Sequence, residues 1–467
     1  MHQEAQLWQA EGLIDEGIYQ RLAQRYQFES IESAASNRFV MLLIGLGGVL
    51  LGLGIITFVA ENWQRWSQEL KIVLLLGLFV IVNVLGFYLW RSGSPNVKNS
   101  GTTLRNSISG RNQRLGEGLL IFGALSLGAC LALMSQMFHS SGDAYELFLV
   151  WGGGVLAMAY GLRLRSLSVI AVLLIGWGYY RGIPGVFLGR QGSGLGLDFV
   201  IEHMALLSGA VFVPLAYWCE SQVVFILSVI LLVSGLEANS VRLEAWNLGL
   251  WVMVWLTLPP ALLWGYDDRL LPGVTTQRFR SVARSLAIWG LSLVFFVGSF
   301  QGIWIVWSGV SSEDSISLSR WLLVDVLIFA GLTAWEWFQL AKPSPVRNRG
   351  WGFDTVTTVV AGLLIVTAVV GFWHLEVSPI TTLATFIFNL QLFLLAAGLI
   401  RIGLAEGRRG AFWGGMVLLV LQILSRTVEY NTELMFKALV FVLCGVGVIL
   451  AGLWYERHLR QATNSDY

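Results

Sequence analysis

The feature that most constrains this sequence is a nearly unbroken series of long apolar segments after residue 38. A helix needs about 20 apolar residues to cross a hydrocarbon layer about 30 Å thick, and most of these segments reach that length. A backbone that crosses lipid must satisfy its own hydrogen bonds, which an α-helix does within one segment. The sequence therefore predicts an all-α fold, a polytopic transmembrane helix bundle of about 14 helices.

The segments are separated by short polar stretches. They cover residues 39–60, 70–90, 116–138, 146–161, 166–180, 199–218, 222–237, 246–265, 285–307, 320–341, 355–373, 381–400, 411–425 and 435–455. The fourth, fifth, seventh and thirteenth are short and contain glycine. Any of these four can be tilted, broken or re-entrant, as some helices of transporters are.

Composition supports a membrane protein and excludes other classes. Only 13% of the 467 residues are charged, whereas soluble domains usually carry about 25%. The net charge is +1 and no basic face appears, so we expect no nucleic-acid partner. The three cysteines, Cys130, Cys219 and Cys444, lie far apart in apolar surroundings and match neither a disulfide framework nor a zinc site.

The positions of the basic residues predict an orientation. With alternating loops, 22 of the 30 Lys and Arg residues fall on one side and eight on the other. The eight are Arg65, Lys71, Arg181, Arg190, Arg242, Arg320, Arg426 and Lys437. Basic residues in short loops stay in the cytoplasm, so both termini are predicted to be cytoplasmic.

Five regions follow from this pattern. Residues 1–38 form a cytoplasmic amphipathic helical segment, and residues 39–90 form the first transmembrane hairpin. Residues 91–115 are a basic, flexible cytoplasmic linker rich in Ser, Asn and Gly. Residues 116–455 form the main transmembrane bundle, and 456–467 are a cytoplasmic tail.

Polar residues gather at the helix ends that are predicted to face away from the cytoplasm. Glu61 and Asn62 end the first segment, while Gln136, His139 and Asp143 follow the third. Asp325 lies about one turn inside the tenth segment. Further polar residues at such ends are Glu146, Glu202, His203, Gln301, His374, Glu376, Arg426 and Glu429. Ionisable groups within a membrane are costly and usually face a bundle interior or a water-filled cavity.

Each of these residues also has a structural interpretation. Helix ends lie among lipid headgroups, where charges cost little, so Glu61, Asp143, Glu202 and Glu376 can be ordinary interfacial residues. Asp325 and Glu336 lie within spans and are harder to explain in that way. His139, His203 and His374 with an acid would suit zinc chemically, but their spacing does not support a site, so no metal and no cofactor are expected.

Two stretches resemble a known family. One is Leu7-Trp8-x-x-Glu11-Gly12-Leu13-Ile14, with the later Phe58-Val59-Ala60-Glu61-Asn62-Trp63; the other is Gln136-Met137-Phe138-His139-x-x-Gly142-Asp143. They are similar to hallmarks of domain-of-unknown-function family 2157, bacterial predicted multi-pass membrane proteins. The resemblance covers roughly the first third of the chain. It implies a multi-pass protein of a bacterial-type inner or internal membrane, and it supplies no substrate.

The residues leave three functions open. The leading expectation is a transporter or channel-like protein that binds a small solute or ion through Glu61, Asn62, Gln136, His139, Asp143 and Asp325. One alternative is a membrane sensor or assembly factor that signals through residues 1–38. The other is an intramembrane enzyme acting on a lipid-linked substrate with Asp143 and His139. Motifs of soluble-type enzymes are absent, which favours a protein that is not an enzyme.

Overall fold

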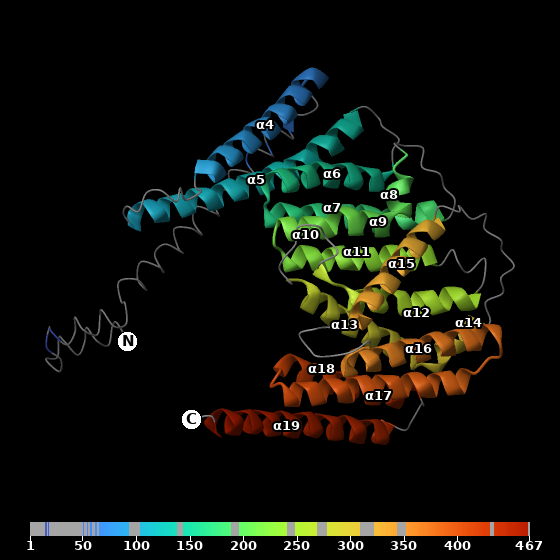
Figure 1. Ribbon diagram of the computed structural model, residues 1–467. Coiled ribbons are helices and arrows are strands. Elements are labelled where there is room, and N and C mark those ends of the chain that lie inside the picture. The colour runs from blue at the N-terminus through green and yellow to red at the C-terminus, as the bar shows by residue number, and fades with distance from the viewer. Residues whose placement is uncertain are drawn as a thin grey trace. The chain divides into compact units, whose positions relative to one another are not determined.

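The computed structural model describes residues 65–92, 103–137, 143–187, 196–240, 248–268, 278–308, 322–342, 352–429 and 434–465, with a few isolated positions before residue 65 (Figure 1). All regular secondary structure in these ranges is helical. The chain forms two compact units, Met1–Ile81 and Val82–Tyr467. The second unit contains all the contacts discussed below.

The described helices follow one another with short connections. In chain order they are α4 (Gln68–Ser92), α5 (Thr103–Met137), α6 (Ala144–Leu162), α7 (Arg165–Phe187), α8 (Asp198–Glu202), α9 (Met204–Leu207), the π-helix η1 (Ser208–Phe212), α10 (Val213–Trp218), α11 (Gln222–Ser240), α12 (Leu248–Gly265), α13 (Arg280–Gly298), α14 (Gln301–Ser308), α15 (Leu322–Ala341), α16 (Thr355–Glu376), α17 (Thr381–Ala405), α18 (Arg409–Glu429) and α19 (Leu434–Ser465).

The helices agree with the apolar segments read from the sequence. Within the described ranges, eleven helices are long and apolar enough to cross a membrane, and Met204–Trp218 and Lys437–Leu453 are shorter apolar stretches. Every predicted segment from residue 70 onward coincides with one of these. The segment 39–60 lies almost wholly outside the described residues. A helical, multi-pass integral membrane protein is thus confirmed, while the number fourteen stays a prediction.

The interrupted helices are not the four that the sequence singled out. Those four correspond to α6, α7, α11 and α18, which are all continuous. The breaks fall instead in the segments 199–218 and 285–307. In the first, Pro214 lies at the start of α10 and cannot donate a backbone hydrogen bond to the preceding turn, which forms the π-helix η1. In the second, α13 ends at Gly298, whose carbonyl accepts a 2.6 Å bond from Trp304 Nε1.

The predicted linker 91–115 needs a correction. Helix α5 begins at Thr103, so the second half of that stretch is helical and continuous with the following transmembrane segment. Within residues 103–115, two Leu, three Arg and Gln113 favour a helix, and there is no proline. Residues 93–102 lie outside the described ranges.

In the second unit, helices that follow one another in sequence pack side by side. Helix α6 lies against α7, α7 against α11, and α17 against α18 (Figure 1). Helix α12 is central, because it contacts α11, α13, α15 and α16. A buried aromatic group joins α13, α14 and α17: Phe388 lies 6.2 Å from Phe295 and 5.0 Å from Trp304, measured between ring centroids.

Three contacts near helix ends agree with the predicted alternation of the loops. At one end, Arg165 Nε donates to the carbonyl of Cys219 at 3.0 Å, and Arg278 pairs with Glu220 at 2.7 Å. The hydrogen bond from Arg278, together with its charge, lowers the pKa of the exposed Glu220 carboxyl below its usual value. At the other end, Gly249 N donates to Glu376 at 3.0 Å. Each contact joins loops that the sequence places on the same side.

Candidate functional site

Asp325 is the predicted site residue with the most unusual environment. It is the fourth residue of α15, within a candidate membrane span, and its side chain is 0% exposed. Burial of a carboxylate within a membrane span is costly unless other groups compensate it. Its partners therefore decide what this residue can do.

Two side chains from different elements meet the Asp325 carboxylate. His203 Nδ1 lies 2.7 Å from Asp325 Oδ1, where an Nδ1–H donates to the carboxylate. Asn239 Nδ2 donates to the other oxygen, Oδ2, at 3.3 Å. The same Asn239 nitrogen donates to the backbone carbonyl of Glu202 at 2.8 Å. Both carboxylate oxygens thus have a donor, and we call Asp325, His203 and Asn239 the Asp325 cluster.

The local fold brings these three residues together. His203 is the single residue between α8 and α9, with a backbone that is not helical (φ −106°, ψ 29°). Asn239 lies in the last turn of α11, which packs against α9. Gly235 allows the close approach, because a Cβ at this position would lie 2.6 Å from the backbone nitrogen of Ala205. The break in the helix and the small residue beside it thus create the cluster.

The cluster is closed on one side and open on the other. Asp325 is fully buried and Asn239 is 2% exposed, but the His203 side chain is 30% exposed. The imidazole can therefore relay a proton to Asp325, while the carboxylate itself stays buried. Carboxylate and imidazole pairs of this kind are used for proton relays in membrane proteins.

The other five predicted site residues do not join this cluster through any contact that the described ranges contain. Gln136 is exposed near the end of α5, and Asp143 is exposed before α6, where its side chain makes no capping bond. His139 lies outside the described residues. Glu61 and Asn62 belong to the first unit, so their relation to Asp325 stays a prediction. Among the predicted site residues that the structure describes, Asp325 alone is buried.

The sequence pattern placed His203 among the polar residues at helix ends but not among the six predicted site residues, and it did not single out Asn239. The signal for Asn239 was present, because Glu237 and Asn239 are polar residues at the end of an otherwise apolar segment. The sequence could not show that the sixth, seventh and tenth apolar segments, which supply His203, Asn239 and Asp325, lie side by side at the ends that carry these residues. Their meeting depends on helix packing.

His374 and Glu376 have structural roles. His374 Nδ1 accepts from Ile380 N at 3.0 Å, and its Nε2 lies 3.0 Å from the carbonyl of Trp304, to which Nε2–H donates. The imidazole therefore fastens the turn between α16 and α17 to α14. Glu376 accepts a hydrogen bond from Gly249 N, a donor in the first turn of α12 that has no partner within its own helix.

Arg426 and Glu429 also connect helices. They form an ion pair with each other at the end of α18. Glu429 Oε1 accepts from Gln301 N at 2.7 Å, and Arg426 donates to Ser299 Oγ at 3.3 Å. Since Ser299 and Gln301 flank the break between α13 and α14, this pair fixes that break in place.

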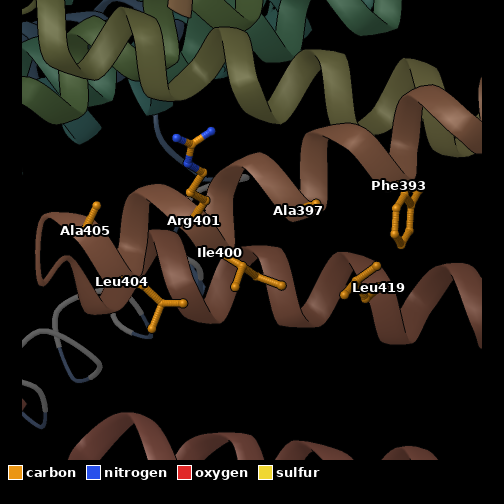
Figure 2. A pocket seen from close by; sticks show the side chains of 7 residues that line it. All are labelled: Phe393, Ala397, Ile400, Arg401, Leu404, Ala405 and Leu419. Atoms are coloured by element: carbon orange, nitrogen blue, oxygen red, sulfur yellow. The ribbon is translucent and has the colours of Figure 1, made fainter. Parts of the chain in front are cut away.

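Figure 2 shows an apolar groove of about 520 Å³ along α17 and α18. Phe393, Ile400, Leu404 and Leu419 are among its lining residues, and Arg401 extends to the opposite side of α17 from Leu404 (Figure 2). With no other polar side chain in its lining, the groove lacks the convergent polar groups of a specific ligand site. Nor do three His, Cys, Asp or Glu side chains gather as metal ligands in the described part of the chain.

Comparison with known proteins adds a family but no activity. Residues 6–168 match the family described as "Predicted membrane protein (DUF2157)". This stretch includes Glu61, Gln136 and Asp143 and ends before the Asp325 cluster. No curated protein and no solved structure matches the chain. Residues 6–168, about the first third of the chain, are thus similar to the DUF2157 family of predicted membrane proteins.

Proposed function

We propose that this protein is a membrane transporter in which the Asp325 cluster binds a proton or a small cation. The observation that carries the proposal is a fully buried carboxylate within a span, paired at 2.7 Å with a histidine that is 30% exposed. Ionisable residues inside membrane spans generally belong to ion or substrate pathways. The partly exposed imidazole gives such a pathway an entrance.

The broken helices around the Asp325 cluster favour a site that changes conformation over a rigid structural site. The segment that supplies His203 consists of α8, α9, η1 and α10 in place of one straight helix. Helix α12 contains Pro259 and Pro260, which each remove a backbone donor from the helix interior. Discontinuous helices next to a buried binding site are typical of secondary transporters, in which they gate access from alternate sides.

An apolar barrier adjoins the cluster. Phe329 and Val326 on α15 pack with Leu232 and Leu236 of α11 and with Leu258 and Leu262 of α12. These six side chains offer a cation no polar group to replace water, so a cation cannot pass between them without rearrangement. Transport through a change of access suits this arrangement better than an open channel does.

The alternatives receive less support. The enzyme hypothesis used Asp143 with His139, but Asp143 is exposed, and His139 lies outside the described residues. The sensor hypothesis used residues 1–38, of which only two positions are described. Neither has an observation comparable to the buried Asp325 cluster.

The test uses the full chain in proteoliposomes adsorbed to a solid-supported membrane. Concentration jumps of H⁺, Na⁺ and K⁺, each given separately, should produce a current with at least one of the three. Asp325→Asn should reduce that current at least tenfold, because Asn cannot carry the negative charge. His203→Gln, the second variant, should also reduce it.

Glu220→Gln is the matched control, because it makes the same change from acid to amide at an exposed site. Its current should equal that of the wild type. Each protein is checked for a single size-exclusion peak and for its unfolding temperature. Wild-type liposomes that respond like empty ones to all three ions would contradict the proposal. So would full current from a folded Asp325→Asn variant.

A further inference from the structure

A large cavity lies at the opposite end of α15 from the Asp325 cluster. Its volume is about 1870 Å³, and its lining comes from the ends of α12, α13, α15 and α18 together with part of α17. Pockets for small molecules usually measure about 300–1000 Å³, so this one offers room for a larger ligand. The sequence prediction places this end on the cytoplasmic side.

Glu336 is the most informative residue of the cavity wall. It lies in a candidate membrane span and is only 3% exposed. Neither carboxylate oxygen has a hydrogen-bond partner among the described residues. The nearby charge that acts on it is Asp267, which has the same sign. A nearby cation would stabilise the ionised form of a carboxylate this deeply buried, and the described part of the protein does not pair one with it.

Because Gly265 has no side chain, Glu336 has room beside it. A Cβ on Gly265 would lie 2.9 Å from Glu336 Oε2 and 3.0 Å from Glu336 Cβ. Any other residue would therefore push the carboxylate away from the wall. The end of α12 is thus shaped to hold an acid that has no partner within the described protein.

Basic residues line the same cavity. Arg280 and Arg284 lie one turn apart at the start of α13, and the Arg284 guanidinium is 5.3 Å from the ring centroid of Trp264. Lys342 is a third cation of the lining, and Arg408 pairs with Glu406 at 3.2 Å. Arginines at neighbouring helix positions suit a phosphate group. Asp267 and Asp354 complete the charged lining, so both signs are present.

Another part of the lining is apolar and exposed. Trp289 is 70% exposed, and Val417 and Leu421 are also exposed large side chains. These residues belong to α13 and α18, both candidate membrane spans. A ligand that fills the cavity would therefore meet charged groups at one part and a hydrocarbon-like surface at another. This combination suits an amphiphile.

We propose that this cavity binds a phospholipid whose headgroup carries a primary amine. The amine pairs with Glu336, the phosphate pairs with Arg280 and Arg284, and the acyl chains lie along Trp289, Val417 and Leu421. The proposal does not depend on transport, because it concerns binding at the other end of α15. An Asp325→Asn variant should accordingly bind the lipid as the wild type does.

The test is native mass spectrometry of the full chain in detergent. Phosphatidylethanolamine, phosphatidylglycerol with the same acyl chains, and glycerophosphoethanolamine without chains are added separately. The wild type should bind phosphatidylethanolamine at least tenfold more tightly than phosphatidylglycerol, since only the former has an amine. Glycerophosphoethanolamine should bind at least tenfold more weakly than the intact lipid, because it lacks the chains.

Variants separate the two parts of the headgroup. Glu336→Gln should remove the preference for the amine while phosphatidylglycerol still binds. Arg284→Gln should weaken both lipids by at least fivefold. Glu220→Gln and Arg278→Gln make the same changes at exposed positions and should behave like the wild type.

Several results would overturn the proposal. Equal binding of the two lipids by the wild type is one, and a preference that survives Glu336→Gln is another. Equal binding of glycerophosphoethanolamine and the intact lipid would assign the site to a small zwitterion instead. The Glu336→Gln substitution removes a buried charge without changing size, so a misfolded variant is not expected; an unfolding temperature measured alongside checks this.

Discussion

Asp325 and Glu336 lie on the same buried face of α15, eleven residues and about three helical turns apart. The rise of an α-helix places them about 16 Å from each other along the axis. Both are within the span, at 0% and 3% exposure, but Asp325 has two side-chain partners and Glu336 has none in the described ranges. One helix thus presents a paired acid at one end and an unpaired acid at the other.

This difference predicts opposite effects on stability. Asp325→Leu should lower the free energy of unfolding by roughly 2–3 kcal/mol, because the amide of Asn239 and the imidazole of His203 lose their acceptor. Glu336→Leu should leave it unchanged or raise it by up to about 2 kcal/mol, since no partner is lost and a buried charge is removed. Thermal unfolding in detergent, followed by tryptophan fluorescence, measures both. Equal destabilisation by the two variants would show that Glu336 has a partner as strong as His203.

The hairpin of α17 and α18 provides a second prediction with an internal control. A Cβ on Gly403 would lie 2.4 Å from the backbone nitrogen of Phe412, so Gly403→Ala should destabilise the protein by about 1–3 kcal/mol. Gly398, on the same helix, has nothing within 4 Å of such a Cβ. Gly398→Ala should therefore be neutral or stabilise by up to about 1 kcal/mol, because glycine weakens a helix interior. Unfolding temperatures in the same ranking would confirm the close approach; the reverse ranking would contradict it.

His374 and His203 should separate stability from transport. His374→Ala leaves the part-buried Ile380 N–H and the buried Trp304 carbonyl without their imidazole partner, which should cost about 2 kcal/mol of stability. The ion-driven current per folded molecule should stay at the wild-type level, because the described contacts of His374 are hydrogen bonds to backbone groups and ring packing against Trp304, and none of them reaches the Asp325 cluster. His203→Ala should instead abolish the current, and it should also lower the stability, because it removes the imidazole partner of the buried Asp325 carboxylate. A current abolished by His374→Ala in folded protein would place this residue in the pathway after all.

The sequence predicted the helices well and the site in part, for physical reasons that can be separated. Apolar segments become helices in any membrane arrangement, because the backbone must satisfy its hydrogen bonds locally. That Asp325 is buried follows from its place inside a span. Its partners do not follow, since His203 and Asn239 meet it only through the close packing of Ala205 on Gly235. Gly152 and Gly153 illustrate the same limit: a Cβ on Gly152 would meet Ile175 at 2.5 Å, but one on Gly153 would meet nothing within 4 Å.

The predicted orientation can be tested at two exposed acids. Asp143 lies at the end predicted to face away from the cytoplasm, and Glu220 at the cytoplasmic end. In a chain whose Cys130, Cys219 and Cys444 are replaced by serine or alanine, Asp143→Cys should react with a membrane-impermeant maleimide in intact spheroplasts. Glu220→Cys should react only after the membrane is opened, because its loop is predicted to lie inside.

The labelling result also bears on the direction of transport. Reaction of Glu220→Cys alone in intact spheroplasts would invert the orientation, and the exposed imidazole of His203 would then receive its ion from the cytoplasm. Reaction of both cysteines in intact spheroplasts would mean that the two ends do not lie on opposite sides of the membrane. The expected pattern instead places the Asp325 cluster on the outer side and the cavity at Glu336 within reach of lipid from the inner leaflet. The labelling result therefore shows in which orientation the protein must be inserted into the vesicles for the current measurements.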